Sequence, residues 1–184
     1  GSITSFPKGN KGIKIGDYNY PPAVFTLWSE SERNAIGIYT VEIDDTNQKD
    51  ETFYYNTSIT YAFGSGKVTG SYGTATAKPH ADTKWTQEEI DAEASDAPAG
   101  ADTNTVKTIG LTTIYKNKFN IEAARLLAKT DWYVIKATEV ESYNVPSAIT
   151  TYRTGVRSKI NSMETAIDNC SDVAALETLL SYKT

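Results

Sequence analysis

Short alternations of apolar and polar residues dominate the first half of the chain. Residues 12–18 alternate between glycines, residues 39–43 alternate again, and residues 53–63 form a longer stretch rich in tyrosine and threonine. A period of two is typical of half-buried β-strands. Residues 67–75 follow the glycine-rich turn at 64–66, and this pair of segments predicts a β-hairpin.

Two helix start signals interrupt this β-rich pattern. Ser29 is followed three residues later by Glu32, and Thr86 is followed at the same spacing by Glu89. Such a hydroxyl–carboxylate pair is the capping box, in which each side chain satisfies a free backbone N–H group. We therefore expect one short helix over residues 29–37 and another beginning at Thr86.

The last third of the chain has the period of an α-helix. Apolar residues share one face of residues 116–129, and they recur every three or four positions over residues 146–168. The second of these segments opens at a proline, which suits the first turn of a helix. Ser171 or Asp172 is placed to cap a last short helix. Residues 132–135 are aromatic and β-branched, and we expect a short extended segment packed under the helices.

Composition divides the chain into three parts. Residues 3–78 carry the strand patterns, residues 79–110 shift toward Asp, Glu, Ala, Pro and Gly, and residues 111–184 carry the helical patterns. We predict an α+β protein, in which a small antiparallel β-rich N-terminal module is followed by a linker with a short helix and then by a helical C-terminal part.

Charge and hydropathy exclude several classes of protein. The net charge is −5 and the sequence pI is about 5.0, and the chain has no run of Lys and Arg, which argues against a nucleic-acid partner. No apolar run approaches the roughly 18 residues that span a bilayer, so we expect no membrane partner. The N-terminus has no apolar signal-peptide core, and we expect synthesis in a cytoplasm.

Candidate chemistry is sparse. The chain has one histidine, His80, which we interpret as an exposed loop residue, and one cysteine, Cys170, which we interpret as a structural thiol. The acidic turn at residues 44–51 offers oxygen ligands for calcium, but Lys49 intrudes and the sharp-turn glycine is missing, so a solvated turn is the better interpretation. We expect no enzyme, no catalytic residue, no cofactor and no metal site. A carboxylate pair for glycoside hydrolysis stays open, because it would form only in three dimensions.

One C-terminal stretch carries a more specific pattern. A helix rich in small residues ends near Leu126-Leu127 and runs into Thr130-Asp131-Trp132; then, after Val145-Pro146, a second helix carries Tyr152-Arg153 and Arg157. This order resembles the C-terminal segment of tailed-phage tail-fibre and tail-fibre-assembly proteins.

The N-terminal half also resembles phage proteins. Residues 20–39 contain a Tyr-Pro segment, a short polar helix and an Ile-Gly-Ile turn, and residues 50–55 contain an acidic turn that leads into Phe-Tyr-Tyr. These features are similar to a module of tail-associated phage proteins. The matched stretches, residues 20–55 and 123–157, make up rather less than half of the chain. Chains with this pairing look like structural proteins of marine phages, including those of cyanobacteria.

The resemblance implies a virion structural protein of the tail or tail fibre, acting through contacts with other virion proteins. Homo-oligomerisation is expected, because virion parts are usually built on rotational symmetry. One alternative is a tail-fibre assembly chaperone, although the chain ends in a Leu-rich helix and lacks the tryptophan- and proline-rich tail of those chaperones. Another is a carbohydrate-binding module for host attachment, built on tyrosine-rich strands. The candidate contact residues are Trp132, Tyr133, Tyr152, Arg153, Tyr54 and Tyr72.

Overall fold

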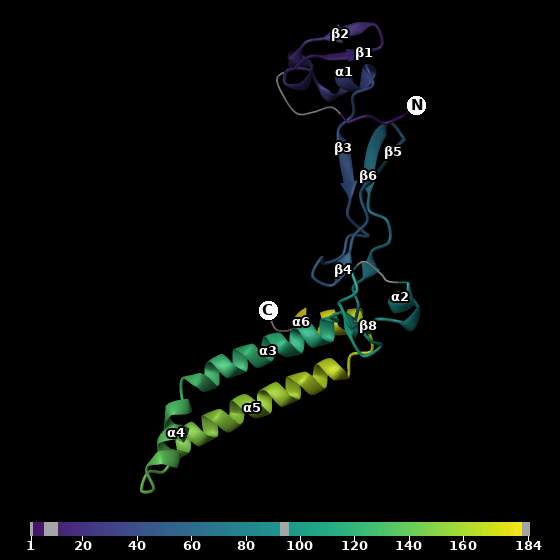
Figure 1. Ribbon diagram of the computed structural model, residues 1–184. Coiled ribbons are helices and arrows are strands. Elements are labelled where there is room, and N and C mark those ends of the chain that lie inside the picture. The colour runs from purple at the N-terminus through teal and green to yellow at the C-terminus, as the bar shows by residue number, and fades with distance from the viewer. Residues whose placement is uncertain (1, 6–10, 93–95, 182–184) are drawn as a thin grey trace. The chain divides into compact units, whose positions relative to one another are not determined.

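The computed structural model describes residues 2–5, 11–92 and 96–181. Contacts divide the chain into two compact units, Gly1–Thr76 and Ala77–Thr184. The first unit contains most of the strands and the second contains the long helices (Figure 1), so the predicted α+β class is confirmed. The boundary lies close to residue 78, where we expect the β-rich module to end, and the expected linker at 79–110 belongs to the second unit.

The first unit opens with a hairpin and a short helix. β1 (Ile13–Ile15) pairs antiparallel with β2 (Tyr18–Tyr20), and a 3-10 turn, η1 (Pro22–Phe25), leads to α1 (Glu30–Ala35). The expected capping box is present, because the Ser29 backbone N–H donates to Glu32 at 2.8 Å and the Glu32 N–H donates to the Ser29 hydroxyl at 3.3 Å.

A three-stranded sheet follows, in the order β3 (Val41–Asp44), β6 (Lys67–Ser71), β5 (Thr60–Gly64). β5 and β6 form the predicted hairpin, whose two turn residues have positive φ values of 52° at Ser65 and 77° at Gly66. Such a turn matches the right-handed twist of the two strands. β3 runs parallel to β6, which the alternation pattern does not reveal. The segment expected over 53–63 forms two short strands, β4 (Tyr54–Tyr55) and β5.

The strand register places apolar residues on one face of this sheet and polar residues on the other. Residues opposite one another on adjacent strands project to the same side. One side therefore carries apolar residues around a glycine, and the other side carries polar and charged residues, including the ion pair between Lys67 and Glu42. The apolar side consists of Val41, Ile43, Val68, Gly70, Tyr61 and Phe63.

The second unit begins with a small structure around Trp85. β7 (Thr76–Ala77) lies where the two units join in sequence, and β8 (Thr83–Lys84) pairs antiparallel with β9 (Val106–Thr108). α2 (Gln87–Asp91) starts at the capping box expected at Thr86. Trp85 is buried, with the Lys107 ammonium 4.7 Å from its ring centroid, and Lys107 also pairs with Glu89.

Four helices complete this unit: α3 (Leu111–Ala128), α4 (Asp131–Glu139), α5 (Ser147–Asp168) and α6 (Val173–Ser181). α3 and α5 lie side by side (Figure 1) and run antiparallel, since Lys116 pairs with Asp168 while Arg153 bonds to the Leu127 carbonyl. The helices expected at 116–129 and 146–168 are thus confirmed, and Pro146 is the N-cap residue of α5. Their core contains Leu111, Ala123, Met163, Ile167, Val173 and Leu176.

The extended segment expected at residues 132–135 is wrong. These residues lie within α4, and Trp132 is 51% exposed instead of packed under the helices. A break at Thr130 starts the new helix, and Asp131 in its first turn interacts favourably with the helix dipole. Aromatic and β-branched residues favour strands mainly through their packing on a sheet, and residues 132–135 belong to none of the sheets formed by the described residues.

The first turn of α3 is held by the segment before β8. The Leu111 and Thr112 N–H groups donate to the carbonyls of Pro79 and His80 at 2.9 and 3.0 Å, and the Gly110 N–H donates to the Asp82 carboxylate at 2.7 Å. These contacts satisfy N–H groups that a helix start leaves without an internal partner. α3 therefore begins five residues before the expected position at 116.

Gly110 allows this close approach, and we predict that Gly110→Ala destabilises the second unit. A Cβ atom at this position would lie 2.2 Å from the Ala81 carbonyl carbon, which is backbone and cannot move aside cheaply. We expect a loss of about 2 kcal/mol or more in the free energy of unfolding, measured by urea titration. The matched control is Gly155→Ala within α5, where a Cβ meets nothing within 4 Å; it should gain about 0.5–1 kcal/mol. Equal stability of Gly110→Ala and the wild type would contradict the contact.

Candidate functional site

The two halves of the C-terminal sequence pattern meet in space at Arg153. This residue lies in the second turn of α5, opposite the point where α3 ends and α4 begins. Its guanidinium nitrogen Nη1 donates to the Leu127 carbonyl at 2.9 Å and to the Thr130 hydroxyl at 2.7 Å, and it lies 2.8 Å from a carboxylate oxygen of Asp131. We call these four residues the Arg153 cluster.

Local hydrogen bonds shape the receiving side of the cluster. The N–H and the hydroxyl of Thr130 both donate to the Leu127 carbonyl at 2.9 Å, which closes the last turn of α3. The Tyr133 N–H then donates to the Thr130 carbonyl at 3.2 Å and opens α4. Thr130 thus ends one helix and begins the next, and Arg153 binds the resulting corner.

Burial makes this cluster a structural element. Arg153 is 8% exposed and Thr130 is 9% exposed, whereas half of the Asp131 side chain is in contact with solvent. A buried guanidinium is stable only when its donors are paired, and hydrogen bonds that involve a charged group contribute about 1.5–3 kcal/mol. The bonds of Arg153 to Leu127, Thr130 and Asp131, together with its burial, place this candidate contact residue in the interior of the second unit.

The other candidate residues of the second unit are more accessible. Trp132 is 51% exposed, and its ring lies 3.8 Å from that of the half-buried Tyr133, centroid to centroid. Tyr152 is 41% exposed, with its hydroxyl 3.5 Å from the Leu126 carbonyl. Trp132 directly follows Asp131 in the sequence, and Tyr152 directly precedes Arg153. Each of the two segments that form the Arg153 cluster therefore carries an exposed aromatic residue.

Tyr54 and Tyr72 lie in the first unit, so the six candidate residues do not form one site within either unit. Both tyrosines are half-buried, and the Tyr72 carbonyl accepts a hydrogen bond from the Asn47 side chain at 3.2 Å. Elsewhere in this unit the rings of Tyr20 and Trp28 meet edge to face at 5.9 Å, and Tyr39 packs on Phe63 at 4.7 Å. Several of the aromatic residues thus pack on one another.

His80 and Cys170 do not form a catalytic pair. His80 is half-buried, which corrects the exposed loop position expected for it, and its Nε2 atom has no hydrogen-bond partner among the described residues. The Cys170 thiol donates to the Ala166 carbonyl at 3.4 Å. Burial, and secondarily the nearby Asp172 carboxylate, raise the pKa of this thiol, so that the thiolate needed for nucleophilic attack is disfavoured.

Carboxylates of the acidic turn are used in local hydrogen bonds. Asp44 accepts from the N–H and the hydroxyl of Thr46 at 3.1 and 2.6 Å, and these bonds, the hydroxyl first, lower the pKa of its carboxyl group. Asn56 clamps the turn by exchanging two bonds with the Lys49 backbone at 2.9 and 2.8 Å. Within the described ranges, no three His, Cys, Asp or Glu side chains gather as a metal site would require.

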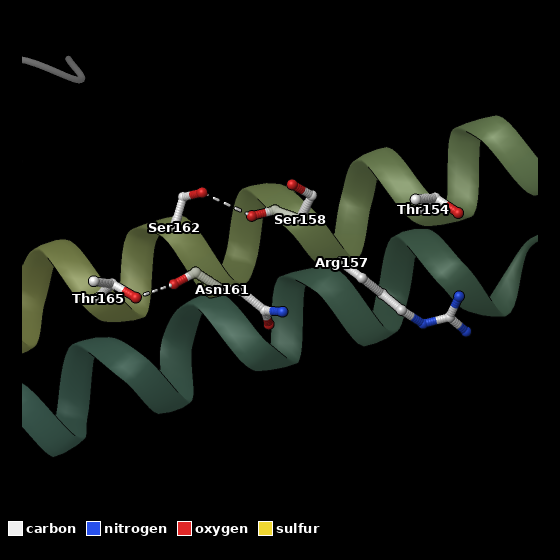
Figure 2. A pocket seen from close by; sticks show the side chains of 6 residues that line it. All are labelled: Thr154, Arg157, Ser158, Asn161, Ser162 and Thr165. Carbon is white, nitrogen blue, oxygen red and sulfur yellow. Dashed lines mark hydrogen bonds between the residues drawn. The ribbon is translucent and has the colours of Figure 1, made fainter.

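A shallow depression lined by polar residues lies on the described surface of the second unit. Figure 2 shows its six lining residues, all of which belong to α5: Thr154, Arg157, Ser158, Asn161, Ser162 and Thr165. The hydroxyls of Ser162 and Thr165 donate to the carbonyls of Ser158 and Asn161, each at 2.9 Å, as serine and threonine commonly do within helices. Its lining residues include no base to activate a hydroxyl, so we interpret this surface as the outer side of a helix.

Comparison with known proteins adds no assignment. No family model, no curated protein and no solved structure matches the chain. None of the helices in the described ranges combines the length and apolar character needed to cross a membrane.

We predict that Arg153→Met destabilises the second unit by about 2–3 kcal/mol, because it removes two charge-assisted hydrogen bonds and an ion pair while keeping similar bulk. Urea unfolding followed by circular dichroism measures the change. Asp131→Asn is the control, and it should lower the free energy of unfolding by about 1 kcal/mol or less. The Asp131 side chain is half exposed, so water can take the place of its carboxylate beside Arg153. The assignment fails if the two variants lose similar stability.

We also predict that Cys170 reacts slowly with alkylating reagents at pH 8 in the folded chain. Its raised pKa lowers the thiolate fraction at any given pH, and only the thiolate reacts. The rate with iodoacetamide should increase when urea unfolds the chain, which serves as the internal reference. Equal rates before and after unfolding would show that burial does not protect the thiol.

Proposed function

We propose that this chain is a structural protein of a tailed-phage particle, associated with the tail, and that it works through protein–protein contacts. The observation that carries the contact role is the apolar side of the sheet formed by β3, β6 and β5. Val41, Ile43, Tyr61 and Phe63 on this side are 41–54% exposed. Association with the tail rests on the resemblance of residues 20–55 and 123–157 to tail proteins.

A sheet with one apolar side is normally stabilised by a second layer on that side. Here the central strand supplies only Val68 and Gly70, and Gly70 leaves room for the side chains of Ile43 and Tyr61 to close over the strand. The outer strands keep about half of their large apolar side chains in solvent. Burial of that surface against another protein would be favourable at roughly 25 cal/mol per Å² of apolar area.

The uniform chemistry of this side favours a protein partner over a sugar. Carbohydrate sites combine an aromatic platform with polar groups that fix the orientation of the ligand. The polar groups of this sheet project to the opposite side, among them Glu42, Asp44 and Lys67. A tail-fibre assembly chaperone also works through protein contacts, so location separates that alternative from the virion protein.

The test is the composition of the particle. Particles of the phage that encodes this chain are purified, and the chain is quantified by mass spectrometry against known tail proteins. We expect a fixed ratio to those proteins and loss of the chain from tailless particles. Presence in infected cells with absence from purified particles would overturn the virion role and favour the chaperone.

A variant pair tests the contact role. Phe63→Ser should reduce incorporation into particles by about tenfold or more, because a large exposed apolar residue is removed from the proposed contact. Ala62→Ser, the neighbouring position on the opposite side of β5, should be incorporated normally. Because Phe63 also touches Tyr39, Ile43→Thr provides a second variant if Phe63→Ser is unstable. Normal incorporation of the folded Phe63→Ser or Ile43→Thr chain would contradict a contact through this side.

A further inference from the structure

α3 carries apolar residues on two opposite sides. One side, which includes Ala123 and Leu127, packs toward α5. The other side, which we call the outer face of α3, consists of Ile114, Ile121, Ala124 and Ala128. These positions are separated by seven, three and four residues, and this spacing aligns them along one side of an α-helix.

The outer face is open in the single chain. Ile121 is 70% exposed and Ile114 is 46% exposed, and both alanines are exposed as well. A helix packed on one side only is normally polar on its other side, and a helix that is apolar all round is normally buried all round. α3 also carries polar and charged residues, but the four apolar residues of its outer face are all exposed in the single chain.

We propose that the outer face of α3 is covered by the same face of other copies of this chain, packed in parallel about a rotation axis. This inference rests on the proposed function, since it names the partner of one contact surface in a virion component. Ile114, Ile121 and Ala128 recur at intervals of seven, with Asn117 and Ala124 between them. That spacing places isoleucine or alanine at the first core position of each coiled-coil heptad.

Charge supports a parallel arrangement of like chains. One edge of the outer face carries the cations Lys118 and Arg125, and the Arg125 guanidinium also bonds to Glu122 of its own helix at 2.9 and 2.7 Å. The opposite edge carries Asn120, whose amide nitrogen holds the Glu164 carboxylate of α5 at 2.6 Å. In a parallel pair, the edge with Lys118 and Arg125 on one copy faces the edge with Asn120 on the next. A residue on one edge lies opposite the residue five positions later on the partner, so that Arg125 of one copy meets Asn120 and Glu164 of the next. An antiparallel pair would instead place Lys118 and Arg125 against the same cations of its partner.

The seam is short, which predicts a modest affinity. Positions 114 and 128 lie about 21 Å apart along a helix that rises 1.5 Å per residue. The area that a seam of this length can bury is smaller than the roughly 800 Å² per partner that a standard stable complex buries. Association of the free chain should therefore depend on concentration, and it would be reinforced by the other contacts of an assembled particle.

The first test compares two serine variants of the full chain by analytical ultracentrifugation over a dilution series. Ile114→Ser/Ile121→Ser should raise the dissociation constant by about tenfold or more, or give a monomer. The matched control is Ile135→Ser on α4, which removes an isoleucine that is 55% exposed outside the outer face, and it should associate like the wild type. Because the replaced side chains are exposed, all variants should keep the same helix content and unfolding midpoint when diluted to monomers. A monomeric wild type, or a double variant that associates as well as the wild type, overturns the proposal.

A charge exchange tests the parallel edge contact. Arg125→Glu and Glu164→Arg should each weaken association, and an equimolar mixture of the two single variants should associate better than either alone, since opposite charges then meet at both edges of a mixed pair. Failure of the mixture to recover association overturns the parallel arrangement. Self-association through this face in a chain that is absent from particles would uphold this inference and refute the virion role. A chain that is monomeric in solution but present in particles would refute this inference and uphold the virion role.

Discussion

The guanidinium of Arg153 connects the end of α3, the hydroxyl of Thr130 and the carboxylate at the start of α4. The corner between α3 and α4 needs such a donor, because the last carbonyl groups of a helix have no partner within it. The same contact fixes the register of α5 along α3. At the other end of the pair, Lys116 binds both oxygens of Asp168 at 2.9 Å, so the antiparallel helices are held near both ends by charged groups and along their length by apolar packing.

This arrangement accounts for the sequence pattern from which the resemblance came. Thr-Asp-Trp and Tyr-Arg are far apart in the sequence, yet Thr130 and Asp131 of the first bind Arg153 of the second. The pattern therefore encodes a helix corner, and a corner is compatible with many functions. The proposed contact role rests instead on exposed aromatic and apolar side chains. These are Trp132 and Tyr152 near the corner and the large apolar residues of β3 and β5 on the sheet. Complete burial is correspondingly rare among the large side chains, and is reached by Val24, Ile167 and Leu176.

Local signals in the sequence predicted local structure well. Both capping boxes, the hairpin turn at residues 64–66 and the proline start of α5 each depend on a few neighbouring residues, and each is present. Features that depend on distant partners were not predicted. The early start of α3 requires the carbonyls of Pro79 and His80, the parallel pairing of β3 requires β6, and the burial of Arg153 requires the corner at Thr130. The outer face of α3 was not predicted either, because Ile114 lies ahead of the helix expected at 116–129, and only the position of α5 shows which side of the helix is left open.

The bonds from residues 79–82 to the first turn of α3 also decide where this chain can be divided. A fragment cut at the start of the helix would expose three N–H groups, those of Gly110, Leu111 and Thr112, that the intact chain satisfies through Asp82, Pro79 and His80. It would also separate Trp85 from Lys107. A helical fragment that keeps these bonds must therefore begin ahead of Pro79, because residues 79–82 support the first turn of α3.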